Sequence, residues 1–406
     1  MADEKTVLVL QGGGALGAYQ CGVAEMLNAA DTPLDWVAGI SIGAINSALM
    51  AGNAPQDRIP AMKTFWERIT SVSKTFDLWT AWSPRRMANT WSAARTTITG
   101  APGFFQLRVP SAALRAPGTP GANSFYDTSA LRDTLLELVD FDRINNGPTR
   151  LSVGAVNVET GNMTWFDSHE TTIRPEHIMA SGALPPGFPA IEIDGSLYWD
   201  GGLVSNTPLQ WVLEAQDGKQ DLAIFQVDLF PAKGDCPESV WGSEAREKEI
   251  RFSSRTRLNT DVLLGLHELH QAARRLARKL PEEFRDDPDL ARLMGGEHDP
   301  RISIAHLIYR RSAAETGSSD YEFSHRSMKL HWERGARDAE RTLAHARWQN
   351  RHSGEDLIDT FDLSELPPEH PAQPERTENE SHGRGRKGLL DAADKPGLPK
   401  GPVQVH

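Results

Sequence analysis

The chain has 406 residues, 39% of them hydrophobic, and a formal net charge of −12 at pH 7. This length and composition suffice for one large domain with a buried core plus an addition. The negative charge argues against nucleic-acid binding, because phosphate contacts need a basic face. No run approaches 18 consecutive apolar residues, so we expect no transmembrane segment and at most a peripheral membrane contact. Two widely separated cysteines and the lack of an export signal at the N-terminus predict a cytoplasmic protein without a metal site.

The first fifty residues contain two successive strand-turn-helix patterns. An apolar run at residues 7–10 precedes a glycine-rich turn at residues 12–17 and a helical pattern that continues to Leu27. A second strand is expected at residues 36–40 and a helix of small residues at 42–51. Two such units in a row imply a parallel, doubly wound α/β sheet.

Later patterns extend this sheet to about residue 230. Two further buried strands and two helices are expected, the strands at 151–156 and 222–229 and the helices at 129–139 and 208–215. The intervening segment 97–127 is rich in glycine and proline and contains Phe104 and Phe105. It is too long for a passive connection, so we interpret it as a lid or a pocket wall.

The composition and the hydrophobic pattern of the chain change near residue 243. Long charged helical patterns cover 244–280 and 321–348, with a strand-like run at 301–309 between them. We therefore expect a catalytic domain at residues 1–235 and a mainly helical extension at 236–350. Residues 367–406 have no apolar periodicity and are expected to be disordered.

A serine motif lies between the second strand and its helix. The sequence Gly39-Ile40-Ser41-Ile42-Gly43 has the Gly-x-Ser-x-Gly form of a nucleophile elbow. In such an elbow a sharp turn places the serine in a strained backbone region, and only glycine leaves room on either side. The motif is short enough to occur by chance, so its surroundings must decide its meaning.

The glycine turn at residues 12–17 has three possible uses. It matches G-x-G-x-x-G, but no acidic residue ends the second strand, as dinucleotide binding requires. It lacks the Gly-Lys-Ser/Thr of a phosphate-binding loop. The free N–H groups of Gly13 and Gly14 could instead form an oxyanion hole, and a purely structural turn is the alternative. The nearby serine motif favours the oxyanion hole.

Ser41 needs a base, and none of the thirteen histidines is a clear candidate. Asp200 is a better one, because it follows an apolar run and precedes Gly201 and Gly202, which let a ligand come close. A carboxylate with a reference pKa near ~3.9 is a weak base, so a Ser-Asp pair depends on geometry and on oxyanion donors. A tight turn at a strand end is the simpler interpretation of Asp-Gly-Gly alone.

Four motifs in this order resemble the patatin-like phospholipases, over roughly residues 5–230. They are Gly12-Gly13-Gly14-Ala15-Leu16-Gly17, Gly39-Ile40-Ser41-Ile42-Gly43, Ser181-Gly182-Ala183-Leu184-Pro185-Pro186-Gly187, and Asp200-Gly201-Gly202 with Asn206 and Pro208. The resemblance implies a three-layer α/β/α sandwich with a mostly parallel central sheet. The region 240–345 is similar to a C-terminal extension found in a bacterial subgroup of the family.

By position, the resemblance implies that Ser41 is the nucleophile and Asp200 the proton acceptor. The implied oxyanion hole consists of Gly12, Gly13, Gly14, Ala15 and Gly17; Gly39 and Gly43 flank the nucleophile, and Gly201 and Gly202 complete the Asp-Gly-Gly motif. Many family members have a basic residue where this chain has Leu16, so a cationic side chain near the oxyanion is not expected here.

The sequence thus predicts a serine hydrolase that cleaves carboxylic esters of phospholipids or other acyl lipids through an acyl-enzyme. It requires neither a metal nor an organic cofactor. Two alternatives stay open: an acyltransferase, and a catalytically weak protein that docks on lipid surfaces.

Two segments could contact a membrane. The aromatic run 76–82 precedes Arg85 and Arg86, although core packing explains the aromatics slightly better. A leucine repeat between residues 263 and 280, close to Arg274, Arg275, Arg278 and Lys279, could bind anionic lipid or a partner protein. A helix packed on the domain with a solvated face is the favoured interpretation of that repeat.

Overall fold

The computed structural model describes most of the chain between residues 4 and 363, and residues 1–368 cluster as one compact unit. The described residues are 4–71, 96, 98–216, 220–253, 256–284, 287–294, 300–310, 319–353 and 358–363. The aromatic run 76–82 and the tail 367–406 lie outside this set, so their predicted roles stay predictions.

A nine-stranded sheet forms the centre of the fold, in the order β11-β10-β9-β1-β2-β5-β8-β7, with β6 paired to β5. Neighbours from β11 to β5 run parallel, whereas β6, β7 and β8 pair antiparallel. The strands are β1 (Lys5–Leu10), β2 (Trp36–Gly39), β5 (Arg150–Asn157), β6 (Met163–Asp167), β7 (Ile191–Ile193), β8 (Ser196–Asp200), β9 (Leu222–Asp228), β10 (Ile302–Ile308) and β11 (Ile358–Phe361). The expected α/β class with a mostly parallel sheet is confirmed.

Helices connect and cover these strands, and most expected elements lie within a few residues of their predicted bounds. The helices before residue 235 are α1 (Ala18–Ala29), α2 (Ile42–Ala51), α3 (Pro55–Ile69), α6 (Ser129–Leu138), α7 (Phe141–Asn146), α8 (Pro175–Ser181) and α9 (Leu209–Ala215). Those after it are α10 (Val240–Phe252), α11 (Thr256–Ala277), α12 (Pro288–Met294), α13 (His325–Ala344) and α14 (Ala346–Gln349).

The expectation that the sheet ends near residue 230 is wrong. β10 pairs in parallel with β9 along its whole length, from Ile302 opposite Leu222 to Ile308 opposite Asp228, and β11 pairs with β10. Parallel pairing buries most of β10 on both faces, which explains why five of its seven residues are apolar. The region expected to be a helical extension therefore supplies one strand of the central sheet, β10, and the residues after it supply another, β11. The division near residue 235 stays a prediction about the sequence.

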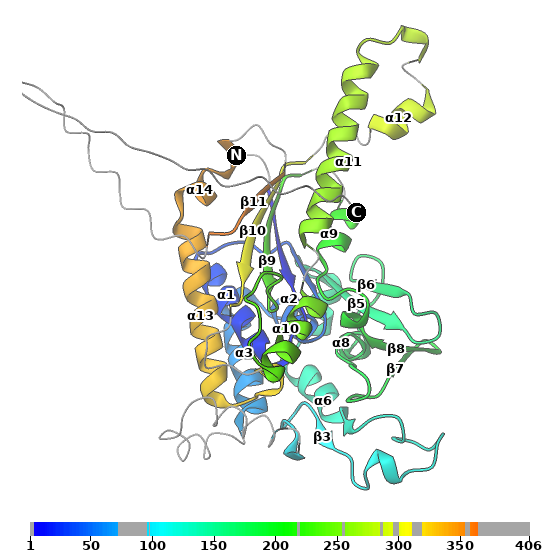
Figure 1. Ribbon diagram of the computed structural model, residues 1–406, viewed down its shortest axis with the longest axis vertical. Helices are drawn as coiled ribbons and strands as arrows, with labels where there is room; N and C mark the ends of the chain where they lie inside the picture. The colour runs from blue at the N-terminus through cyan, green and yellow to red at the C-terminus, as the bar shows by residue number, and fades with distance from the viewer. Residues whose placement is uncertain are drawn as a thin grey trace, which may run out of the picture. The chain divides into compact units, whose positions relative to one another are not determined.

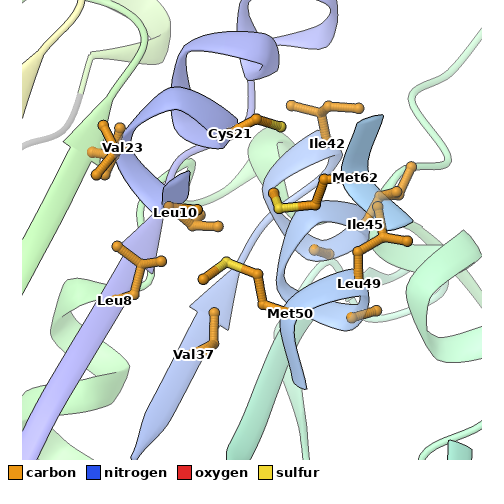
Figure 2. Packing of buried hydrophobic residues seen from close by; sticks show 14 of the residues in the cluster. Leu8, Leu10, Cys21, Val23, Val37, Ile42, Ile45, Leu49, Met50 and Met62 are labelled. Atoms are coloured by element: carbon orange, nitrogen blue, oxygen red, sulfur yellow. The ribbon is translucent and has the colours of Figure 1, made fainter. Parts of the chain in front are cut away.

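Two hydrophobic cores lie on opposite faces of the sheet, because side chains alternate along each strand. Leu8 and Leu10 of β1 pack into the larger core with α1, α2, α3 and α13. Val7 and Val9 face a smaller core, which α9 covers. Figure 2 shows part of the larger core, where side chains from β1 and β2 meet those of α1 and α2. The three-layer α/β/α arrangement follows from these two cores.

Helix α13 lies against α1, although some 300 residues separate them in the chain (Figure 1). Glycines at the contact allow the two backbones to approach: a Cβ at Gly22 would lie 1.9 Å from the carbonyl oxygen of Trp332. A Cβ at Gly335 would lie 1.9 Å from the carbonyl oxygen of Tyr19. The same helix pair thus needs a glycine on each side.

Helix α11 differs from the favoured prediction that its leucines pack on the domain. It extends away from the sheet and contacts α12 (Figure 1). Val262, Leu266, Leu269 and Leu276 are exposed. Their spacing of four, three and seven residues places them on one side of the helix. Among the described helices, none is long and apolar enough to cross a membrane.

Candidate active site

Ser41 occupies the turn between β2 and α2 with φ 56° and ψ −124°, a conformation that is strained for a residue with a side chain. The flanking glycines make the turn sterically possible. A Cβ at Gly39 would lie 2.3 Å from the Gly43 carbonyl oxygen, and a Cβ at Gly43 would lie 2.4 Å from the Leu10 carbonyl oxygen. The geometry is that of a nucleophile elbow, with Ser41 at the N-terminus of α2.

Asp200 ends β8 and meets Ser41 in space. The amide of Gly202 donates a hydrogen bond to the Asp200 carboxylate at 2.7 Å, and the Ser41 side chain lies close enough to favour the charged form of this carboxylate. Asp200 is only 2% exposed. Burial raises the pKa of this carboxyl group to about 7, while Ser41 and Gly202 act in the opposite direction. A carboxylate with this pKa is a much better base near neutral pH than a solvated one.

The segment 181–183, at the C-terminal end of α8, contacts the backbones of both Ser41 and Asp200. The side-chain oxygen of Ser181 accepts a hydrogen bond from the Ser41 amide at 3.1 Å. The carbonyl oxygen of Ala183 accepts one from the Asp200 amide at 3.0 Å. One short segment therefore fixes the backbone of both residues. The sequence resemblance includes the motif that begins at Ser181 but assigns it no role, because its contacts with Ser41 and Asp200 form only in the tertiary structure.

The glycine turn lies beside Ser41, and its five predicted residues separate into two groups. The amide of Gly12 donates to the Asn206 carbonyl oxygen at 3.2 Å, so it is not available to a substrate. Ala15 and Gly17 are buried within the short helix η1 (Gly14–Gly17) and its packing. Within the described part of the chain, the amides of Gly13 and Gly14 have no backbone acceptor, and both residues line the cavity in front of Ser41. These two are the donors that the geometry favours.

Gly12 is required for a different reason, which is close packing. A Cβ at Gly12 would lie 2.4 Å from Asn206 Oδ1 and 3.0 Å from Ser41 Cβ. Asn206 Nδ2 in turn donates to the carbonyl oxygen of Gly12 at 3.1 Å. Asn206 therefore holds the glycine turn close to Ser41. Leu16, where many family members are basic, is fully buried and does not face the cavity.

Buried side chains connect this turn to the end of β9 and to α10. Gln11 is fully buried; its Oε1 accepts from the amides of Leu229 and Phe230, and its Nε2 donates to the Phe252 carbonyl oxygen at 3.0 Å. Asn206 Nδ2 donates to the same Phe252 oxygen at 3.0 Å. The C-terminal end of α10 is thereby fixed next to the glycine turn.

A cavity of about 460 Å³ opens in front of Ser41 and Asp200. One wall is aromatic and consists of rings in mutual contact, namely Phe104, Phe105, Tyr126, Phe188 and Phe323. The expectation that the segment around Phe104 and Phe105 forms a pocket wall agrees with this placement. The volume lies in the range typical of sites that bind small molecules.

Another part of the lining comes from the chain after residue 235. Asp320 and Tyr321 of the short helix η6 (Ser319–Tyr321) line the cavity together with charged residues of α10. The backbone carbonyl of Asp320 lies so close to Gly14 that a Cβ there would be 2.3 Å away. Gly14 also has φ 56°, so a side chain at this position would be strained as well. Sequence reasoning assigned no site residue to this region.

No histidine is among the described residues that line the cavity. His177, a buried histidine with its pKa lowered to about 4 by desolvation, binds the Arg174 amide instead. The described residues also contain no group of three or more histidine, cysteine, aspartate or glutamate side chains that could hold a metal ion. The two cysteines are free, Cys21 buried and Cys236 exposed.

The chain matches two family models. The model described as patatin-like phospholipase covers residues 8–212, and one described as patatin phospholipase covers residues 250–355. The two matched regions together contain every residue of the cavity that has been named above, apart from Phe230 and most of α10.

Curated relatives are more distant. A "cGAMP-activated phospholipase" of Pseudomonas aeruginosa is 26% identical over 215 residues, which is 50% of this chain and 54% of that protein. A "Lysophospholipase nte1" of Neurospora crassa is 28% identical over 245 residues, 60% of this chain but 13% of that protein. The chain thus spans about half of the first relative and a small part of the second.

Solved structures show only weak likeness. VipD from Legionella pneumophila aligns at 14% identity with a TM-score of 0.32, covering 82% of this chain and 67% of that one. ExoU in its complex with SpcU from Pseudomonas aeruginosa aligns at 14% identity with a TM-score of 0.29, covering 87% and 71%. The fold assignment therefore rests on the sheet itself. With a family model that matches half of its length, the chain belongs to the patatin-like phospholipase family.

Proposed function

We propose that the protein is a serine hydrolase of lipid carboxylic esters that acts through a Ser41-Asp200 pair and an acyl-enzyme. The observation that carries the proposal is that the strained Ser41 and a buried Asp200, whose pKa is about 7, line one cavity, where Ser41 favours the charged form of Asp200. The amides of Gly13 and Gly14 face the same cavity. Membership of the family and the phospholipase names of the curated relatives support a lipid ester as the substrate.

Asp200 accepts the Ser41 proton while the serine oxygen attacks the ester carbonyl. The negative charge that develops on the carbonyl oxygen is stabilised by the amides of Gly13 and Gly14 and by the N-terminus of α2. Collapse of the tetrahedral intermediate breaks the ester bond, and Asp200 returns its proton to the leaving alcohol. Water then attacks the acyl-enzyme, Asp200 takes a proton from it, and collapse releases the fatty acid and regenerates Ser41.

The cavity supports an apolar acyl group on this substrate. Its aromatic wall, which includes Phe104, Phe105 and Phe188, excludes water and offers dispersion contacts to an alkyl chain. We place the acyl chain there and the alcohol part of the ester on the side of α10.

A fluorophosphonate probe tests the nucleophile. Wild-type protein should be labelled covalently on Ser41, and Ser41→Ala should not be labelled, because the probe needs an activated serine. Ser47 provides a matched control, since it is a buried serine of the same helix that does not line the cavity. Labelling of Ser47→Ala should match the wild type; wild-type protein that stays unlabelled would contradict the hydrolase proposal.

We further propose a peripheral contact with lipid surfaces through α11, and a cytoplasmic location. The exposed stripe of Val262, Leu266, Leu269 and Leu276 supports the contact, because isolated exposed leucines are common but an aligned row on one helix face is not. Exposed Arg275, Arg278 and Lys279 occupy the C-terminal part of the same helix and the turn after it. The free thiols fit a reducing compartment.

A further inference from the structure

The charged residues of α10 that line the cavity have no role in the hydrolysis proposed above. Glu244, Glu247, Lys248 and Arg251 of α10 all line the cavity. Their spacing of three, one and three residues is that of one helix face. Four charged side chains on a single face that lines a lipid site offer contacts to the polar part of a ligand, because a fatty acyl chain has no charge that could use them.

The two ends of this face lie at different distances from the catalytic serine. Phe252, the last residue of α10, is held at the glycine turn by Gln11 and Asn206. Arg251 and Lys248 are therefore the charged residues of this face that lie nearest, along α10, to the end held at the glycine turn. Glu244 lies eight residues before Phe252, which corresponds to about 12 Å along a helix axis. Along α10 the sequence of charges from the serine outward is positive, then negative.

This order matches one class of head group. In a glycerophospholipid the phosphate is close to the acyl esters, and in a zwitterionic head group the ammonium lies beyond the phosphate. We propose that α10 selects zwitterionic phospholipids, with Arg251 and Lys248 toward the phosphate and Glu247 and Glu244 toward the ammonium. This inference rests on the proposed function, because it assumes that the ester is attacked by Ser41.

The present partners of the two cations do not prevent such binding. Arg251 pairs with Glu247 at 2.7 Å, and their side chains are 66% and 56% exposed, so this ion pair contributes little and can open. Lys248 pairs with Asp320 at 2.5 Å and lies over the Tyr321 ring, so it is held more firmly in the wall. Arg251 is thus the cation that can move to a phosphate. Its guanidinium can bind two phosphate oxygens at once.

The test compares three lipids with identical acyl chains in micelles of one neutral detergent. Phosphatidylcholine carries both charges of the head group, phosphatidylglycerol carries the phosphate only, and diacylglycerol carries neither. A soluble ester without a head group, p-nitrophenyl butyrate, reports the hydrolase chemistry alone. Wild-type kcat/KM should be highest for phosphatidylcholine and lowest for diacylglycerol, by about tenfold at each step.

Two variants should alter this ranking in different ways. Arg251→Gln should lower kcat/KM for both phospholipids by about tenfold more than for diacylglycerol and the soluble ester. Glu244→Lys should lower the preference for phosphatidylcholine over phosphatidylglycerol by about tenfold. Glu238→Lys makes the same charge change on an exposed residue that precedes α10 and does not line the cavity, so it should keep the wild-type preference.

Two results would overturn the head-group inference while the hydrolase proposal stands. One is equal rates on the three lipids together with hydrolysis of the soluble ester. The other is an equal loss of preference in Glu244→Lys and Glu238→Lys, which would reveal an effect of net charge only. Absence of activity on all four esters would instead contradict the proposed function, and with it this inference.

Discussion

At the scale of single residues, the environment of Asp200 turns a poor base into a suitable one. A solvated aspartate with a pKa near ~3.9 holds a serine proton weakly. In the fold, removal from water raises this pKa to about 7, even though the nearby Ser41 side chain and the Gly202 amide favour the charged form. A histidine is therefore not needed to bring the base close to neutral pH, and none lines the described part of the cavity.

The pKa of Asp200 predicts how activity depends on pH. Asp200 must be ionised to accept the Ser41 proton, so kcat/KM should fall about tenfold per pH unit below pH 7 and level off above it. The profile should be measured on a soluble ester, because its binding has no charged head group to titrate. Asp200→Asn should lose most of the activity at every pH. A wild-type profile that stays flat between pH 5 and 8, or a fully active Asp200→Asn, would contradict the role of Asp200.

At the scale of secondary-structure elements, close backbone contacts set the positions of the catalytic groups. Gly39 and Gly43 let the elbow close, and Gly14 lets the carbonyl of Asp320 pack on the glycine turn. The α1–α13 contact acts on the same part of the fold. Helix α1 directly follows the glycine turn, and α13 packs against α1. Gly335 at this contact is a structural glycine in a helix, where glycine is otherwise unfavourable.

The α1–α13 contact leads to a prediction with an internal control. Gly335→Ala should destabilise the protein by about 1–3 kcal/mol, because its Cβ would lie 1.9 Å from the backbone oxygen of Tyr19 and the helices must separate. Gly265→Ala in α11 makes the same change where no atom lies within 4 Å of the new Cβ. It should be neutral or stabilise by up to about 1 kcal/mol.

Thermal unfolding followed by circular dichroism compares the two variants with the wild type. The expected result is a clear fall in Tm for Gly335→Ala and none for Gly265→Ala. If both substitutions had the same small effect, the close approach of α1 and α13 would not be a constraint on the fold.

At the scale of the whole molecule, the chain after residue 235 is part of the fold that forms the proposed active site. It continues the central sheet through β10 and β11 and covers α1 with α13. It also supplies one wall of the cavity through α10 and η6. α11, by contrast, carries an exposed apolar stripe that the described part of the fold does not cover.

The stripe on α11 predicts how the whole protein behaves with membranes. Wild-type protein should co-sediment with phosphatidylcholine vesicles that contain some phosphatidylglycerol. The triple variant Leu266→Ser, Leu269→Ser and Leu276→Ser should bind at least about tenfold more weakly, because each leucine loses roughly 1.5–3 kcal/mol of burial if fully immersed. A variant with two other exposed leucines replaced, Leu114→Ser and Leu136→Ser, is the matched control and should bind like the wild type. Equal binding of both variants would rule out α11 as the contact.

Much of the fold could be read from local patterns. The two strand-turn-helix units, the strands near residues 151 and 222 and the helices around 129 and 208 depend on apolar periodicity and on glycine, which act over short stretches. The position of 302–308 as a strand of the central sheet could not be predicted from local patterns. Its neighbours in the chain are charged helices, and its pairing with β9 is a contact between segments that are distant in the sequence.

The sequence by itself determined the elbow at Ser41, the glycine turn and the Asp-Gly-Gly motif, because each depends on residue types at fixed short spacing. Only the tertiary structure decided which amides face the cavity, that Ser181 and Asn206 hold the nucleophile and the turn, and that α10 and η6 close the site. These facts arise where segments up to some 300 residues apart in the chain meet. Burial of Asp200 is such a fact as well, and it sets the pKa on which the proposed chemistry depends.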